Sequence, residues 1–210
     1  MARYTGPVDR LSRRENRDLQ LKGERYSKGK NPLQKRPFPP GQSSAGRRKI
    51  STYGTMLREK QSLKRIYGVL ERQFRRYYQI ANSYRGITGT VMLQLLESRL
   101  DNLVYRAGFA TTRPAARQLV SHGHVRVNGR KVDIASARLR PGDVITLKEK
   151  TLASKAVTEA LEWVEKRGGR KGWIEFNPDS KSAKFLHIPA REEIDDIDVK
   201  EQLIVELYSR

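Results

Sequence analysis

Residues 99–143 read RLDNLVYRAGFATTRPAARQLVSHGHVRVNGRKVDIASARLRPGD, and this stretch decides the fold. Apolar residues at spacings of three and four predict a helix whose inward face carries Met92, Leu96, Leu100, Leu103 and Ala107. Gly108 predicts the end of that helix. Thr111 and Thr112 are candidate N-caps for a second helix, which Gly123 would end.

After Gly123 the apolar period changes from helical to two, so Val125 and Val127 would point to one side of a strand. Asn128-Gly129 follows, and this pair favours a tight hairpin because both turn residues need positive φ. Pro141-Gly142-Asp143 marks a further turn before an apolar pair. The stretch therefore predicts a compact module of helix, helix and β-hairpin.

The polar residues of this module are suited to nucleic acid. Residues 113–131 contain no Asp or Glu, and arginine matches phosphate oxygens and stacks on bases. A solvated helix face is the alternative interpretation of any single arginine. Paired histidines can bind metal, but no Cys or carboxylate lies nearby, so no metal site is expected. The candidate RNA-binding residues of the module are Arg113, Arg117, Gln118, Ser121, His122, His124, Arg126, Asn128 and Lys131.

The 210-residue chain has a formal charge of +20, which indicates a polyanionic partner. Residues 1–60 hold 16 Lys and Arg against five Asp and Glu, although their core-forming signals are weak. The chain has no cysteine, hence no disulfide, and no apolar run approaches the roughly 18 residues of a membrane span. A cytosolic protein without a secretory signal or membrane partner is expected.

Residues 1–50 form a basic arm in which the prolines and glycine at 37–41 exclude a helix. The arm could be a disordered tail, but its aromatic residues favour a segment that becomes ordered against RNA. Further candidate RNA-binding residues lie in the arm and the helices after it: Arg3, Arg13, Arg14, Lys22, Arg47, Arg48, Lys49, Tyr53, Arg58, Lys60, Lys64, Arg65 and Arg72.

Helical periodicity predicts helices over 53–67, 70–83 and 152–167. Strands are expected around 173–176, 185–188 and 203–208, with an acidic loop at 192–198. We therefore expect an α+β protein. Its mostly helical lobe would comprise 51–97 and 151–210, with the module, residues 98–150, inserted between them.

Several segments together resemble a known family. The module resembles the RNA-binding module of the S-four family of small-subunit ribosomal proteins, through SRLDNLVYRAGF at 98–109, TRPAARQLVSHGHVRVNG at 112–129 and RPGDVI at 140–145. The resemblance extends to the opening MARYTGPVDRLSRR, PPGQ at 39–42, LREKQ at 57–61, RIYGVLERQFRRYY at 65–78 and EQLIVELYSR at 201–210. It thus covers nearly the whole chain and indicates the bacterial type.

The resemblance implies a protein of the cytoplasmic small ribosomal subunit, with an organellar ribosome left open. It implies direct binding to ribosomal RNA at a 5′-domain junction, nucleation of subunit assembly, and a contribution to translational accuracy. Implied partners also include neighbouring ribosomal proteins and messenger RNA at the channel through which it enters. Many family members bind zinc near the N-terminus through cysteines, but the corresponding positions here are Asp9, Ser12, Tyr26 and Asn31, so we expect a zinc-free form without cofactors.

Two other classes of function fit the sequence less well. An RNA-modifying enzyme can carry such a module, but catalysis needs a positioned nucleophile and base, and a separate catalytic domain would not fit in 210 residues. A DNA-compacting protein would share the charge, but the module lacks a long recognition helix for the major groove. Irregular RNA, recognised by shape, phosphates and splayed bases, suits a short helix and hairpin better.

Overall fold

The computed structural model describes residues 4–23, 25, 28–41 and 50–209. It is an α+β structure, as predicted, and its chain divides into two compact units. Unit 1 comprises residues 1–92 and 196–210, and unit 2 comprises residues 93–195. Helix α6 (Thr88–Glu97) contains the boundary between them.

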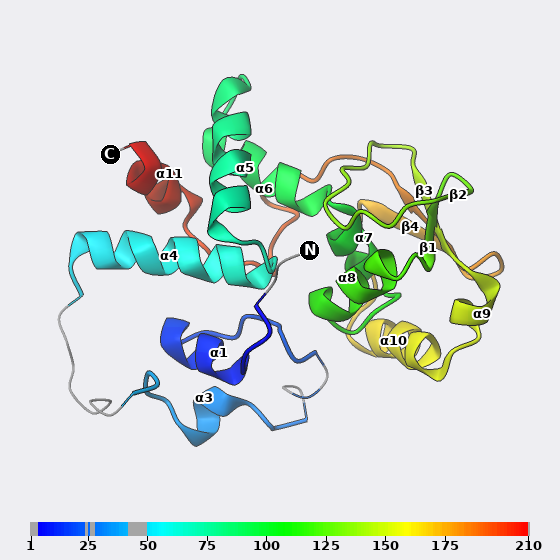
Figure 1. Ribbon diagram of the computed structural model, residues 1–210, viewed down its shortest axis with the longest axis horizontal. Helices are drawn as coiled ribbons and strands as arrows, with labels where there is room; N and C mark the ends of the chain where they lie inside the picture. Colours follow the sequence, from blue (N-terminus) through cyan, green and yellow to red (C-terminus); the bar gives the residue numbers. More distant parts are fainter. Residues whose placement is uncertain (1–3, 24, 26–27, 42–49, 210) are drawn as a thin grey trace. The chain divides into compact units, whose positions relative to one another are not determined.

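The helices of unit 1 are α1 (Asp9–Glu15), α3 (Pro32–Lys35), α4 (Thr52–Ile66), α5 (Glu71–Ser83) and α11 (Glu201–Ser209). Two of them confirm the periodicity: α4 buries Met56 and Leu63, and α5 buries Phe74. Ser51 caps α4, because its Oγ accepts a hydrogen bond from the Gly54 amide at 3.1 Å. Helix α11 packs along α4 (Figure 1), so the C-terminal segment completes the core of this unit.

Unit 2 contains α7 (Leu100–Arg106), α8 (Arg113–Ser121), α9 (Glu149–Leu152) and α10 (Lys155–Lys166). Its strands are β1 (Val125–Val127), β2 (Arg130–Lys131), β3 (Val144–Leu147), β4 (Ile174–Asn177) and β5 (Ser182–Phe185). They form one antiparallel sheet in the order β2-β1-β3-β5-β4. Helices α7 and α8 pack against each other, and Val125, Ile145 and Phe185 on the strands are buried.

Two predictions of secondary structure are wrong, and a third is misplaced: the strand expected around 185–188 is β5, which runs from Ser182 to Phe185. The segment 203–208, expected to be a strand, is part of helix α11. Its apolar run is too short for periodicity to distinguish a strand from a helix, and packing against α4 stabilises the helix. The helix expected across Met92 to Ala107 is broken at Arg99, whose backbone is extended. At this point the backbone pairs with residues 135–139 instead. The Leu100 amide donates to the Ala137 carbonyl at 2.8 Å, and Arg99 and Arg138 form an isolated antiparallel β-bridge.

The lobes expected from the sequence also differ from the two units. The expectation grouped residues 151–195 with the helical lobe, whereas they belong to unit 2. The reason is hydrogen bonding between strands, because β5 pairs with β3 of the module, with Ile145 opposite Ala183. Only residues 196–210 of the C-terminal part belong to unit 1.

Candidate nucleic-acid interface

Helix α8 and the hairpin after it are built as the sequence indicates. The Thr112 hydroxyl caps α8 by accepting from the Ala115 amide at 3.3 Å. Gly123, with φ of 67°, turns the chain out of the helix, and Asn128 and Gly129 have positive φ, as the tight hairpin requires. The side chain of Asn128 ties the hairpin to β3, because its Oδ1 accepts from the Val144 amide at 2.9 Å. Asn128 thus has a structural role beside the predicted one.

Most polar candidates of the module lie at the surface of unit 2. The exposed ones are Gln118, Ser121, His122, Arg126, Asn128 and Lys131. His124 is half-buried, with Nδ1 3.1 Å from the Thr151 hydroxyl. The aliphatic part of Lys131 lies over Gly123, where a Cβ would collide with it, so the glycine lets the cation approach the end of α8. These side chains form a surface that we call the α8–hairpin face.

Arg113, a candidate RNA-binding residue, does not project into solvent. It is 5% exposed; its Nε donates to Asn102 Oδ1 at 2.8 Å, and its guanidinium lies 4.6 Å from the centre of the Tyr105 ring. The N-cap Thr112 directly precedes Arg113, so Arg113 is the first residue of α8, and its side chain points towards Asn102 of α7. Arg117 is largely covered as well, with Nε 3.9 Å from Asp101 Oδ2.

A network of buried charges surrounds Arg113 under α8. Arg106 forms a two-point ion pair with Glu97 at 2.7 and 3.0 Å, and Arg99 pairs with Asp101 at 2.6 and 2.9 Å. Asn102 joins the network through its Nδ2, which donates to Glu97 Oε2 at 2.7 Å. Paired and hydrogen-bonded charges of this kind can remain buried, so the network fixes the orientation of α7 and α8.

In unit 1 several candidate cations are half-buried and paired with carboxylates. Arg58 and Arg65 both contact Glu15, whose side chain is fully buried. Burial raises the pKa of the Glu15 carboxyl, against the lowering effect of the two arginines. Lys60 and Lys64 donate to Glu71 at 2.7 and 3.0 Å. The sequence did not reveal the partner of the two arginines, because Glu15 lies 43 residues before Arg58.

The basic arm, in its described part, is held by its own arginines. Arg13 Nε donates to the Phe38 carbonyl at 3.1 Å and its guanidinium lies 5.2 Å from the Phe38 ring centre. Arg14 donates to the Pro40 carbonyl at 2.9 Å. Lys22 is half-buried. Candidates Arg3, Arg47, Arg48 and Lys49, and Tyr26 of the zinc-related positions, lie outside the described residues.

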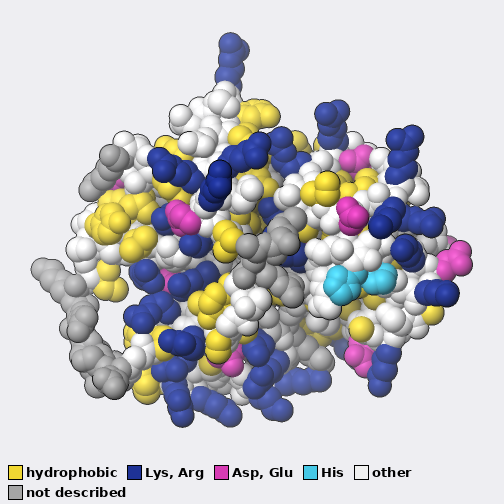
Figure 2. All heavy atoms as spheres, viewed as in Figure 1, with side chains coloured by type: hydrophobic (Ala, Val, Ile, Leu, Met, Phe, Trp, Pro, Cys, Tyr) yellow, Lys and Arg dark blue, Asp and Glu magenta, His cyan; other side chains and the backbone are white. Residues whose placement is uncertain are grey.

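Helix α5 of unit 1 exposes arginines along its outer face. Arg72, a predicted site residue, is exposed, and so are its neighbours Arg75 and Arg76, which were not among the candidates. Their positions in the sequence, next to the apolar stripe that contains the buried Phe74 and Tyr77, could have indicated that they lie on the outer face of the helix. Tyr53 on α4 is 58% exposed. On the face shown in Figure 2, Lys and Arg side chains are widely spread and Asp and Glu side chains are few.

None of the helices in the described residues has the length and apolar character needed to cross a membrane. Among these same residues, no three Cys, His, Asp or Glu side chains are grouped so that they could hold a metal ion.

Comparison with known proteins identifies the family. Residues 3–97 match the model of the ribosomal protein S4/S9 N-terminal domain, and residues 98–145 match that of the S4 domain. Small ribosomal subunit protein uS4 of Kosmotoga olearia is 55% identical, and those of Dictyoglomus turgidum and Geobacter sp. strain M21 are 54% and 51% identical. Each alignment covers 100% of both chains. The chain therefore belongs to the uS4 family of small ribosomal subunit proteins.

Proposed function

We propose that this protein is a structural, non-catalytic component of the small ribosomal subunit that binds a multi-helix junction in the 5′ domain of its RNA. The α8–hairpin face of unit 2 carries this proposal, because it exposes Arg126, Lys131 and His122 within a stretch that has no acidic residue. Phosphate contacts from such side chains would position the RNA, and irregular loops would supply the bases.

In this proposal the candidate residues have two different roles. Exposed side chains on the α8–hairpin face and on α5 contact RNA. Buried or paired ones, such as Arg113, Arg58 and Lys64, hold those surfaces in place through Asn102, Glu15 and Glu71. Arg126 can approach a phosphate without leaving a buried carboxylate unpaired, and Lys131 would give up only an exposed contact with Asp133 at 3.7 Å, which favours this division.

A salt-titrated binding assay tests the function. The full chain is titrated with a 5′-domain junction RNA, a scrambled RNA of equal length and duplex DNA. Each phosphate contact should steepen the salt dependence by about 0.7–0.9 log units in affinity per log unit of salt. Tight binding of the junction RNA alone at high salt is expected. If all three ligands weaken along one slope, the charge of +20 alone explains binding and the proposal fails.

The same proposal includes the finer roles that the family suggests. Early binding to the junction would nucleate assembly, and contacts to neighbouring ribosomal proteins and to messenger RNA at its channel would affect accuracy. Reconstitution without this protein should then stall before later proteins join. Subunits rebuilt with an Arg72→Gln, Arg76→Gln variant, scored for misreading, would test whether the exposed α5 cations contribute to accuracy. A rate equal to that of wild-type subunits would argue against it.

A further inference from the structure

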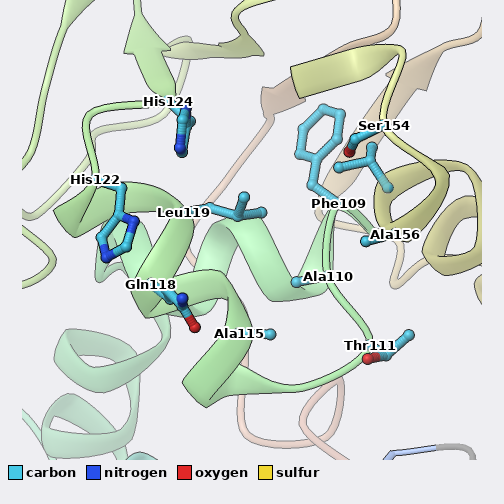
Figure 3. A pocket seen from close by; sticks show the side chains of 11 residues that line it. Phe109, Ala110, Thr111, Ala115, Gln118, Leu119, His122, His124, Ser154 and Ala156 are labelled. Atoms are coloured by element: carbon cyan, nitrogen blue, oxygen red, sulfur yellow. The ribbon is translucent and has the colours of Figure 1, made fainter. Parts of the chain in front are cut away.

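A pocket of about 290 Å³ lies in unit 2 beside the α8–hairpin face (Figure 3). Its floor is formed by the buried residues Phe109, Ala110 and Val157. One wall comes from α8, with Ala115, Gln118, Leu119 and His122, and the opposite wall comes from Ser154 and Ala156 at the start of α10. The volume is near the lower end of the roughly 300–1,000 Å³ of small-molecule pockets, which suits one planar ring system.

The polar groups of the pocket are placed at its rim. Gln118 and His122 are exposed, and neither side chain makes a hydrogen bond to the part of the chain that the structure describes. Both can donate and accept hydrogen bonds, so they can pair with the edge of a heterocycle. Ser154 and His124, by contrast, are engaged with Thr151 at 2.7 and 3.1 Å.

The charges around the pocket favour an anionic chain over a protein segment. None of the lining residues is acidic. The side chain of Lys155, between two lining residues, is 90% exposed, and its contact with Glu159 at 3.8 Å is an exposed pair that a phosphate can replace at little cost. A nucleotide whose base entered the pocket would carry its phosphates past this cation. Splayed bases in single-stranded RNA are bound in this manner, with an apolar surface under the ring and hydrogen bonds at its edge.

We propose that this pocket takes one unstacked base of the bound RNA. The inference rests on the proposed function, since it assumes that the α8–hairpin face contacts RNA. It adds a base-specific contact to phosphate contacts that carry no sequence information. Phe109 and Leu119 would cover the faces of the ring, and Gln118 and His122 would bind its edge.

Filling the pocket tests the proposal. Ala156→Trp narrows it from the α10 side, and Gln118→Leu removes one edge contact from the α8 side. Thr158→Trp is the matched control, because residue 158 is exposed on α10 but does not line the pocket. We expect both pocket variants to bind the junction RNA at least tenfold more weakly with an unchanged salt slope, and the control to remain within twofold. Circular dichroism verifies that each variant is folded.

Chemical probing of base edges then identifies the nucleotide. One base should be protected by the wild type and reactive with Ala156→Trp. Replacing that nucleotide by an abasic one should weaken wild-type binding at least tenfold and leave Ala156→Trp unaffected. If both pocket variants bind and protect the RNA as the wild type does, the pocket holds no base. Weakened incorporation of a neighbouring protein at unchanged RNA affinity would likewise overturn the proposal. Failure of the wild type to prefer junction RNA would instead reject the proposed function.

Discussion

The arginines of the α8 region show how burial separates residues of one type. Arg113 is 5% exposed and binds Asn102 and Tyr105, whereas Arg126, at the centre of β1, is exposed. Both are equally basic in the sequence. A buried guanidinium with hydrogen-bonding partners stabilises the fold, while an exposed one is available to a phosphate.

Arg113→Met should therefore reduce stability more than it reduces salt-dependent binding. It removes a hydrogen bond made by a charged group and a cation–π contact, for an expected loss of about 2–4 kcal/mol in the free energy of unfolding. Urea denaturation followed by tryptophan fluorescence measures this, because both tryptophans of the chain, Trp163 and Trp173, lie in unit 2.

Arg126→Gln should behave in the opposite way. Its stability should stay within about 0.5 kcal/mol of the wild type, as for most surface substitutions. Its salt slope for the junction RNA should fall by about 0.7–0.9, the value of one phosphate contact. A slope equal to that of the wild type would remove Arg126 from the contact surface.

At the scale of elements, two carboxylates join the helices of unit 1. Glu15 joins α1 to α4, and Glu71 joins α4, α5 and α11. Burial alone would raise the pKa of Glu71, but hydrogen bonds from Lys60, Lys64 and Tyr208 outweigh it and lower the pKa to about 2.

This lowered pKa predicts a pH dependence with a definite sign. A carboxyl whose folded pKa is depressed stabilises the fold above its unfolded value of 4.5, and that stability is lost as the pH falls towards 2. Because the side chain is 45% exposed, solvent screening reduces the effect to about 1 kcal/mol. Thermal melting should show Glu71→Gln less stable than the wild type at pH 7, with a narrower gap at pH 3 that closes near pH 2. The control Glu162→Gln, an exposed carboxyl on α10, should change little at either pH; a constant gap for Glu71→Gln would contradict the assignment.

Glu15→Ala should loosen the arm. It leaves Arg58 and Arg65 without their shared carboxylate, whose side chain is fully buried, so a local loss of about 2 kcal/mol is expected. Hydrogen exchange by mass spectrometry should show faster exchange in α1. Arg10→Ala, an exposed change on the same helix, is the matched control and should exchange as the wild type does. Unchanged protection in Glu15→Ala would mean that other contacts hold α1.

The elements differ in how far the sequence predicts them. Helix α8, its Thr112 cap and the Asn128-Gly129 hairpin are governed by local chemistry, so their prediction is confirmed. Helix α11 and the break at Arg99 depend on partners distant in the chain, and local patterns mislead there. The ion pair between Glu15 and Arg58 likewise joins residues that are distant in the sequence. Candidate cations were thus found by composition, but their burial could be learned only from the fold.

At the scale of the whole molecule, the excess of positive charge is distributed over both units. Exposed arginines lie on α5 of unit 1, and exposed cations lie on the α8–hairpin face of unit 2. If the two surfaces bind one RNA junction, their phosphate contacts contribute to a single salt slope. Binding through unit 2 alone would leave the α5 arginines as a solvated helix face. The two possibilities predict different slopes.

Two triple variants distinguish them. Arg72→Gln, Arg75→Gln, Arg76→Gln acts on unit 1, and Arg126→Gln, Arg130→Gln, Lys131→Gln acts on unit 2. We expect each to lower the salt slope for the junction RNA by about 2, since each lost phosphate contact removes about 0.7–0.9. Lys166→Gln, Lys181→Gln, Lys184→Gln controls for net charge, because these exposed cations lie on other elements of unit 2. A lower slope in both surface variants but not in the control means that both units hold the junction, whereas a wild-type slope in the unit 1 variant restricts recognition to unit 2.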